Sequence, residues 1–578
     1  MKLDLRWDAQ FDVETAKIVG RIADDVKGEY VDLIERIGTH QAGGTDWWVS
    51  DLASLNPQAS RLYEHLWKLA LVEELVGSHV PISEIRVETR SLRKVLARWL
   101  QSGHQGNSIR VTGGYRFDSQ ILLGSLLRVA MHGFRTLARV LAGKRDGRAE
   151  VLRVNKPLTL IDIYAGDSQI QEGRFVDRFY GDLMNRIPEE ARETTYYIPL
   201  YYGKRWLLGG LINRLRSTRE RFLFPEDFLR FRDYLFAAAF GLRFARFKMP
   251  SVSFREFDIT PLLKTEKLWA IRSGNSVESL LRMRFALRLR ERGVRLRFVL
   301  NWFENQSVDK GFNWGFRNSF PETPVVGYQG FYPSDEQFFR FPTALEHERK
   351  VIPEKVFVIG VGLAEGIKRF CPDLRVDVAP AFRFSYILQD IVAPSPRSKY
   401  VVLVALPIGA ADANYVMNMV EEACLDLSPD DFHFLIKPHP AAKAPKVRNL
   451  PSSMELVKRD FITVLGESSL VIAYASSTGM EALLSGRRVI VPGNLRGPTI
   501  HSIPSDAPSQ SWQLVYSAAD LAQAIRAFCR SATAEEPTEG WYRMRAHYCE
   551  PVTTDGVARL MGLGPHQTSS DREVGAPA

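Results

Sequence analysis

The segment YVVLVAL (Tyr400–Leu406) is a short run of aliphatic and β-branched residues. A helical pattern over Ala413–Leu425 and a second apolar run, FHFLI (Phe432–Ile436), follow it. Short runs of this kind are typical of parallel strands that are buried on both faces. The alternation continues with two strands and two helices, at Leu470–Tyr474, Gly479–Leu484, Arg488–Val491 and Ala518–Cys529. Strands separated by helices predict βαβ units and a doubly wound parallel sheet over 399–530.

The chain upstream of this sheet is longer and more helical. Helical patterns are clearest over Leu62–Val76 and Ile121–Ala142, and a helix-rich segment with many aromatic and basic residues spans about Phe224–Lys248. Runs that predict strands occur at Leu158–Tyr164, Thr195–Tyr202, Leu296–Trp302, Pro324–Gly327, Val356–Ile359 and Val376–Pro380. We therefore expect an α/β fold with two Rossmann-like domains, the first with helical insertions, as in several classes of two-domain enzyme.

A linker separates the two halves at IVAPSPRSK (Ile391–Lys399), where prolines and serines interrupt both patterns. We expect an N-terminal domain over 1–390 and a C-terminal Rossmann-like domain over 399–530. The remainder, 531–578, is expected to hold a helix and a flexible tail, because its last residues are small and polar.

Composition excludes several classes of protein. The 578 residues are 45% hydrophobic and 25% charged, and no stretch approaches the ~18 uncharged apolar residues of a membrane-spanning helix. The start, MKLDLRWDAQFDVE, has acids where an export signal needs an apolar segment, so we expect a cytoplasmic protein. Its four cysteines lack CxxC spacing, which indicates neither a disulfide framework nor a metal site. A net charge of +9 is too weak to indicate nucleic acid, and we expect no cofactor.

The motif LIKPHP (Leu435–Pro440) directly follows a predicted strand. Its two prolines stop the strand and make the turn rigid, which places Lys437 and His439 at the strand's carboxyl end. Ligands bind at that end of open α/β sheets, and a lysine with an imidazole suits a phosphate. The alternative is a rigid surface turn with an incidental histidine.

A second motif, YASSTGMEALLSG (Tyr474–Gly486), places three hydroxyl side chains between a predicted strand and a helix. The backbone N–H groups at such a helix start favour an anion, and Ser476, Ser477 and Thr478 add hydroxyl donors. Glu481 falls near the first turn of that helix, where we expect it to accept hydrogen bonds from a ribose. The alternative is a capping box between Thr478 and Glu481, which explains those two residues but not the serine pair.

Together, KPHP and SSTGMEALLSG, 35–40 residues apart, resemble the HP and Ser/Thr motifs of bacterial nucleotide-sugar transferases of the GT-B class. Polysialyltransferases, Kdo transferases of capsule and O-antigen, and CDP-glycerol polymerases have versions of them. The resemblance implies a GT-B fold, a donor phosphate held by His439 and Ser476–Thr478 with support from Lys437, and a CMP-linked sugar as donor.

The first half has a resemblance of its own. WFENQ (Trp302–Gln306), Lys310-Gly311, GYQG (Gly327–Gly330) and the segment Thr45–Ser60 are similar to a group of surface-carbohydrate biosynthesis proteins. The GT-B layout implied by the first resemblance makes the first domain the acceptor side, to which we assign Asn305, Gln306 and Gln329.

Two acids of the first half end predicted strands, Glu304 and Asp167. Either carboxylate is placed to act as the base or nucleophile of a glycosyl transfer, and we prefer Glu304. With His439 they form the expected catalytic set. The alternative for each acid is a polar strand end that bonds a nearby loop. The acidic-acidic-Gly base motif of HP-motif sialyltransferases is absent, so a non-catalytic scaffold also stays open.

The segment Phe228–Phe247 mixes arginines with aromatic residues. It suits a peripheral helix on anionic lipid, and the alternative is an ordinary core stripe. The sequence thus predicts a cytoplasmic enzyme at the inner membrane. It would move Kdo or a related ulosonic acid from a CMP-activated donor to a surface-polysaccharide or lipid-linked acceptor. A CDP-glycerol-type phosphotransferase is the nearest alternative.

Overall fold

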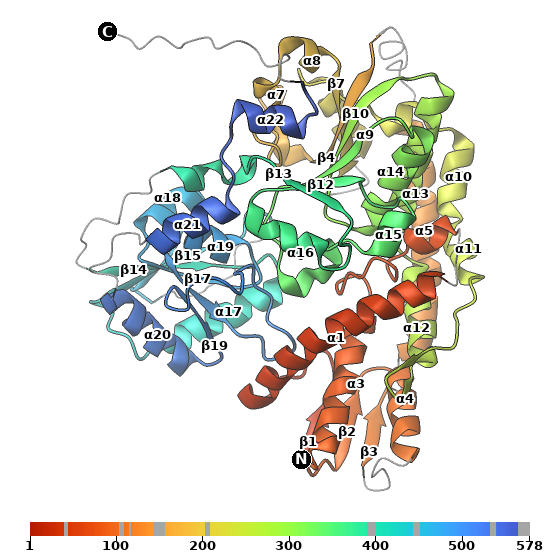
Figure 1. Ribbon diagram of the computed structural model, residues 1–578. Coiled ribbons are helices and arrows are strands. Elements are labelled where there is room, and N and C mark those ends of the chain that lie inside the picture. Colours follow the sequence, from red (N-terminus) through yellow and green to blue (C-terminus); the bar gives the residue numbers. More distant parts are fainter. Residues whose placement is uncertain are drawn as a thin grey trace, which may run out of the picture.

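The computed structural model describes residues 1–39, 44–102, 109–114, 117–142, 156–202, 208–389, 399–442, 451–531 and 539–564 (Figure 1). Two six-stranded parallel sheets form the frame of this part of the chain. In Figure 1 the second domain (cyan to blue) lies to the left of the first (yellow to green), and the N-terminal segment (red to orange) lies below them.

The second sheet has the strand order β16-β15-β14-β17-β18-β19, and every neighbouring pair is parallel. Its strands are β14 (Tyr400–Ala405), β15 (Phe432–Lys437), β16 (Met454–Leu456), β17 (Leu470–Ala473), β18 (Arg488–Pro492) and β19 (Trp512–Val515). Counted within the domain this is 3-2-1-4-5-6, the order of dinucleotide-binding Rossmann sheets. The helices between them are α17 (Ala410–Cys424), α18 (Phe461–Glu467), α19 (Thr478–Leu484) and α20 (Ala518–Ser531).

The first sheet has the order β13-β12-β11-β10-β4-β7 and is also parallel throughout. Its strands are β4 (Leu158–Ala165), β7 (Thr195–Tyr201), β10 (Leu296–Trp302), β11 (Val325–Gln329), β12 (Lys355–Val358) and β13 (Arg375–Val378). Read from β7 the order is 2-1-3-4-5-6, a flavodoxin-like order with one more strand. The expected α/β fold with two Rossmann-like domains is confirmed.

The other elements of the first domain surround its sheet. They are the helices α7 (Leu183–Arg186), α8 (Glu189–Glu193), α9 (Leu208–Arg216), α13 (Gly274–Glu291), α14 (Ser307–Ser319), α15 (Ala344–Glu348) and α16 (Ala364–Lys368), the short 3-10 helices Asp167–Gln169, Pro225–Asp227, Asp335–Arg340, Val361–Leu363 and Phe382–Leu388, and the hairpin β5 (Ile170–Gln171)–β6 (Arg174–Phe175). Helices α13 and α14 are in close contact because Gly311 of α14 carries no Cβ, which would collide with the backbone of Ser279.

The N-terminal segment forms a small unit that the sequence did not predict. Its helices α1 (Val13–Thr39), α2 (Thr45–Trp48), α3 (Leu62–Gly77) and α4 (Arg90–Gln101) accompany a parallel sheet of β1 (Lys2–Asp4), β2 (Glu84–Val87) and β3 (Arg110–Gly113). The strands have three or four residues each, too short for a clear pattern against the surrounding helices. Helix α1 joins this unit to the first domain, where Lys27 pairs with Glu336 at 2.9 Å.

Helical insertions cover one side of the first domain. They are α5 (Phe117–Ala142), α10 (Phe231–Ala238), α11 (Phe240–Ala245) and α12 (Thr260–Ala270), with the hairpin β8 (Ser253–Phe254)–β9 (Phe257–Asp258). In Figure 1 they lie along the right edge, and α5 contacts both α10 and α12. No helix in the described ranges is long and apolar enough to cross a membrane.

The chain returns to the first domain at its C-terminal end. Helix α21 (Glu539–Tyr548) packs on α19, with the Trp541 indole donating to the Leu483 carbonyl at 2.7 Å. Helix α22 (Thr554–Leu560) follows, and Arg297 of β10 donates to the carbonyl of Gly562 at 3.2 Å. The 531–578 segment thus holds two helices that link the domains, and the expected flexible tail beyond residue 564 lies outside the described residues.

Candidate functional site

The crevice of the second sheet lies between β14 and β17, where the strand order reverses. In open α/β sheets, ligands bind outside the carboxyl ends of the strands at such a point. The Ser/Thr loop, residues 474–478, directly follows β17. The KPHP turn follows β15, which pairs with β14 so that Lys437 lies opposite Ala405. The fold therefore brings both sequence motifs to the same edge of one sheet.

The Ser/Thr loop is held by its own hydroxyl groups. Ser477 is the residue before α19, and its Oγ donates to Glu481 at 2.8 Å, while the Ser476 Oγ accepts from the Thr478 backbone N–H at 3.3 Å. The capping box considered for Thr478 and Glu481 is not formed, because the helix begins at Thr478 itself. The Thr478 Oγ1 is buried and has no hydrogen-bond partner among the described residues.

Ala475 adds backbone strain to this loop. Its φ of +50° lies in the left-handed region, where an alanine Cβ is disfavoured. Strained residues of this kind gather at functional sites, where the surrounding structure keeps them in place. The strain lies two residues beyond β17, at the sheet edge to which the sequence assigns the donor phosphate.

His439 is half-buried, and the structure defines how its ring can donate. The Nδ1 accepts the backbone N–H of Ala441 at 3.1 Å, so the neutral imidazole carries its hydrogen on Nε2. Burial lowers the pKa of His439, and the positive charge of Arg383 lowers it further. A neutral Nε2–H donor results. Lys437 is directed elsewhere, since its Nζ donates to the carbonyl of Arg459 at 2.5 Å.

Glu304 lies at the corresponding crevice of the first sheet, between β4 and β10. The Trp302 indole donates to its Oε1 at 2.9 Å and the Gln306 amide to its Oε2 at 2.6 Å. These two donors hold the half-buried carboxylate in one orientation. Gln306 therefore acts on the acid in this structure, whereas the sequence assigns it to the acceptor.

Asp167 has a different environment. Its side chain is 57% exposed and forms an ion pair with Arg214, so it lies on the surface at the end of β4. The two acids thus differ in their surroundings: two neutral donors hold the half-buried Glu304, whereas Asp167 is exposed and paired with an arginine.

Asn305 and Gln329 are buried. The Asn305 amide donates to the Phe339 carbonyl at 2.9 Å and to Glu346 at 3.1 Å, and the Gln329 amide donates to the Arg340 carbonyl at 2.8 Å. With exposures of 0% and 1%, neither amide presents an accessible surface to an acceptor. In this structure both residues hold the segment that carries Arg340.

A buried polar network supports the Glu304 loop from below. Asp309 accepts the backbone N–H groups of Glu304 at 3.2 Å and Gln306 at 2.9 Å. Asp162 forms an ion pair with Arg282 and accepts from the Asn301 amide at 2.5 Å. Burial, together with the nearby charge of Asp162, raises the pKa of Asp309 to about 7.

The sequence reasoning missed two arginines near these acids. Arg340 has a buried Nε without a hydrogen-bond partner among the described residues, and its guanidinium lies over the Phe331 ring at 4.3 Å. Burial lowers the pKa of Arg340, Glu304 and Tyr164 oppose that shift, and Arg383 adds to it. Arg383 is exposed and influences both Arg340 and His439. No local motif marks either arginine, because the proximity of Arg340 to Glu304 and of Arg383 to His439 arises only from the fold.

Loops after the carboxyl ends of both sheets meet at the domain interface. Tyr386, which follows β13, donates to Glu481 of α19, and the Ser502 Oγ donates to the Tyr332 carbonyl at 3.2 Å. Glu481 is 8% exposed, and both of its carboxylate oxygens accept protein hydrogen bonds. In this structure Glu481 holds the two domains together through these bonds, whereas the sequence analysis assigned it to a ribose.

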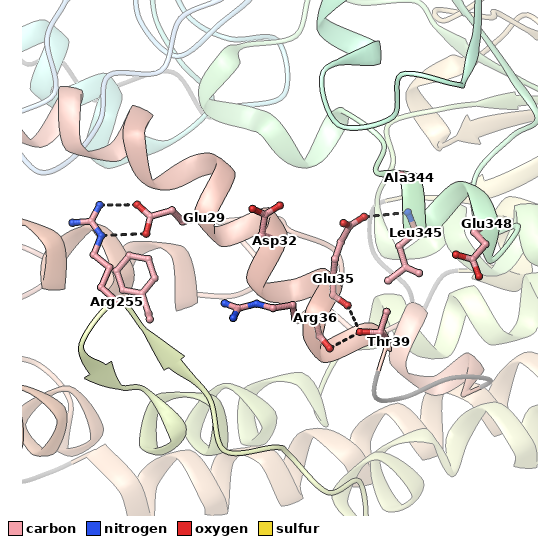
Figure 2. Close-up of a pocket in the computed structure, with 10 residues that line it drawn as sticks. Glu29, Asp32, Glu35, Arg36, Thr39, Arg255, Ala344, Leu345 and Glu348 are labelled. Carbon is pink, nitrogen blue, oxygen red and sulfur yellow. Dashed lines mark hydrogen bonds and ion pairs between the residues drawn. The ribbon is translucent and has the colours of Figure 1, made fainter.

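The groove shown in Figure 2 lies apart from these loops, between α1, α15 and the β8–β9 hairpin. Its volume is about 690 Å³, and four acids line it against two arginines. Figure 2 shows Arg255 reaching Glu29, and Glu35 accepting from the Leu345 backbone. This excess of negative charge does not suit a nucleotide phosphate. Within the described ranges, no group of three or more His, Cys, Asp or Glu side chains could hold a metal ion.

No protein-family model matches the chain, and no curated protein matches it. Among solved structures, the glycosyltransferase of kitacinnamycin is 12% identical, with a TM-score of 0.39 over 72% of this chain and 100% of that chain. The UDP-GlcNAc 2-epimerase of Methanocaldococcus jannaschii, in complex with UDP-GlcNAc and UDP, is 10% identical, with a TM-score of 0.38 over 70% and 99%. The wall teichoic acid polymerase TagF is 10% identical, with a TM-score of 0.33 over 77% and 97%. Likenesses at this level carry no argument about what this chain binds or does.

Proposed function

We propose that this chain is a glycosyltransferase that moves a sugar, Kdo or a related ulosonic acid, from a CMP-activated donor to a surface-polysaccharide or lipid-linked acceptor. One observation carries the proposal. His439 follows β15 and the hydroxyls of Ser476–Thr478 follow β17, so both come after carboxyl ends of strands in one 3-2-1-4-5-6 sheet. That is where such sheets bind nucleotides.

The donor phosphate is assigned to His439 and the Ser/Thr loop. The His439 Nε2–H is a neutral donor that its Nδ1 contact with Ala441 orients. Ser476 and Thr478 supply hydroxyls, and Arg383 contributes positive charge near the imidazole. These groups stabilise the negative charge that develops on the departing CMP. Lys437 has a supporting role through the carbonyls of the 458–459 turn, which it holds.

We assign to Glu304 the role of the base that takes the proton of the acceptor hydroxyl. An acceptor hydroxyl oxygen forms a bond to the anomeric carbon, and the bond from that carbon to the phosphate oxygen breaks. The bonding electrons leave with CMP, and the hydroxyl proton passes to the Glu304 carboxylate. Trp302 and Gln306 orient this carboxylate, and Arg340 lies close enough for their charges to interact.

Attachment to the cytoplasmic face of the inner membrane is part of the proposal. Within the segment Phe228–Phe247, Phe228, Phe240 and Phe244 are buried, but Phe231 and Leu242 are 55% and 63% exposed. The neighbouring helix α5 exposes several more apolar side chains, at 58–75% for Leu123, Leu126, Leu127 and Phe134. Arg128 of α5, Arg232 of α10 and Arg246, directly after α11, are also exposed. A surface of apolar and cationic side chains fits an anionic bilayer interface.

A donor screen tests this function. The protein is incubated with CMP-Kdo, CMP-sialic acid, CDP-glycerol and UDP-sugars, and nucleotide release is followed with and without acceptor glycans. We expect acceptor-dependent release of CMP from a CMP-sugar. Release from CDP-glycerol alone would assign the chain to the glycerol phosphotransferases. If no donor reacts or binds, the non-catalytic scaffold replaces the enzyme.

A further inference from the structure

A basic groove opens on the N-terminal unit, away from the nucleotide edge. It has a volume of about 1040 Å³ and lies between α4, β3, the β8–β9 hairpin and the start of α12. Among its described lining residues, five are cationic (Arg90, Arg93, Lys94, Arg98 and Lys264), and Asp258 is the single acid. Its charge is thus opposite to that of the acidic groove in Figure 2.

The cations follow one face of α4. Arg90, Lys94 and Arg98 are spaced four residues apart, and in an α-helix this spacing places their Cα atoms about 6 Å apart along one side. The opposite face of α4 is fixed in the core through Leu96 and Trp99, which are 0% and 4% exposed. Arg98 lies eight residues after Arg90 in the helix, so the cationic row extends over roughly 12 Å.

Three of the five cations, Arg90, Lys94 and Lys264, have no ion pair with an acid in the described part of the chain. Arg98 pairs with Asp258 at 3.0 Å, and Asp258 also accepts the Thr260 N–H at the start of α12. The hydrogen bond from Thr260 and the charges of Arg98 and Lys264 lower the pKa of Asp258. Arg90, Lys94 and Lys264 are all exposed.

We propose that this groove binds an acidic glycan chain, an extended polymer with regularly spaced carboxylate or phosphate groups. The inference rests on the proposed function, which supplies a glycan acceptor to the protein. A row of cations with a repeat of about 6 Å suits repeated single charges better than one compact phosphate. Hydroxyl side chains such as Ser253 and Thr260 also line the groove and can pair with sugar hydroxyls.

Two other polyanions fit the groove less well. Single-stranded nucleic acid is bound by aromatic side chains on which bases stack, and none of the described lining residues is aromatic. A bilayer surface is flat and favours exposed apolar side chains, which lie instead on α5, α10 and α11. Helix α12 contacts both α4 and α5, so the groove and the apolar surface adjoin the same helix.

Binding of a labelled sialic acid oligomer tests the proposal without requiring catalysis. The triple variant Arg90→Glu/Lys94→Glu/Lys264→Glu should bind it at least about tenfold more weakly than wild type, because three attractions become repulsions. The control is Arg219→Glu/Lys368→Glu/Arg375→Glu, which changes the net charge equally at exposed sites elsewhere. Melting temperatures of both variants check that they fold.

The control should bind the oligomer as wild type does, and neutral dextran should not bind. Equal weakening in both variants, or no binding by wild type at low salt, overturns the proposal. Tighter binding of oligo-dT or phosphatidylglycerol vesicles, lost in the groove variant alone, overturns the glycan as ligand. CMP binding is measured on the same samples. If wild type binds the oligomer but not CMP, the proposed function fails and the glycan site is still supported.

Discussion

Tyr386 of the first domain donates its phenolic hydrogen to Glu481 of the second, and Glu481 in turn accepts from Ser477 in the Ser/Thr loop. These two hydrogen bonds connect the segment that follows β13 in the first domain to the loop that we assign to the donor phosphate. Glu481 is a buried carboxylate, so its orientation depends on both donors.

Replacing Tyr386 by Phe should therefore weaken both the domain contact and the loop. A lost hydrogen bond to a buried carboxylate costs about 1–3 kcal/mol in the free energy of unfolding. CMP affinity should fall because Glu481, the partner of Ser477, loses one of the two donors that orient it. Urea denaturation and calorimetric titration measure the two effects. Tyr542→Phe is the control, because Tyr542 is 47% exposed on α21. Unchanged affinity in Tyr386→Phe would separate these two hydrogen bonds from the donor site.

Replacing Glu304 by Gln should keep donor binding and reduce turnover by about 10²-fold or more, the scale of general-base catalysis. The amide keeps the shape of the carboxylate and one acceptor oxygen for Trp302. Asp167→Asn is the matched comparison and should reduce turnover much less, since Asp167 is exposed and paired with Arg214. Normal turnover by Glu304→Gln would remove this residue from the mechanism.

The raised pKa of Asp309 gives a pH dependence of stability with a definite sign. Its folded pKa of about 7 exceeds the ordinary aspartate value of 3.8, so between these values the folded state holds a proton that the unfolded state has released. The contribution of Asp309 to the free energy of unfolding is fully present below about pH 4 and is lost as pH rises through about 7. Asp309→Asn should remove this slope, which denaturation at pH 5, 6, 7 and 8 would measure. Parallel pH profiles for the two proteins would contradict the assignment.

Membrane attachment should depend on α5. Leu127→Glu/Phe134→Glu places charges where the wild-type side chains are 64% and 75% exposed, and burying them in a bilayer interface is unfavourable. We expect wild type to sediment with anionic liposomes at low salt and the variant to remain in the supernatant. Leu425→Glu, at an 85% exposed position in the second domain, should sediment like wild type. Salt should weaken binding, because it screens the arginine charges.

Much of the fold is visible in the sequence because buried parallel strands have a strong local pattern. The run YVVLVAL became β14 (Tyr400–Ala405), and Leu296–Trp302 became β10 with the same bounds. The missed strands β1, β16 and β19 have three or four residues and are stabilised by their neighbours in the sheet. The residues of the two motifs can be found in the sequence because each motif directly follows a predicted strand. Arg340, Arg383 and Tyr386 cannot be found in this way, because contacts between distant segments leave no pattern in the local sequence.

The exposed arginines of α4 show a related limit. The sequence gives their spacing, but the groove exists only because α12 and the β8–β9 hairpin, about 160 residues later, form its other wall. From the sequence alone, a row of charges on one helix predicts only a solvent-exposed face. A groove can be recognised only when the structure shows a second element opposite that face.

Calorimetric titration of CMP into wild type, His439→Ala and His433→Ala tests the donor site most directly. His433 lies on the same strand β15 and pairs with Glu455, so its variant controls for loss of an imidazole. We expect His439→Ala to bind CMP about 10–100-fold more weakly, as for one lost hydrogen bond to a charged group, and His433→Ala to bind as wild type. Wild-type CMP affinity in His439→Ala, or no CMP binding by the wild-type protein, would contradict the assignment of the nucleotide to this edge of the second sheet.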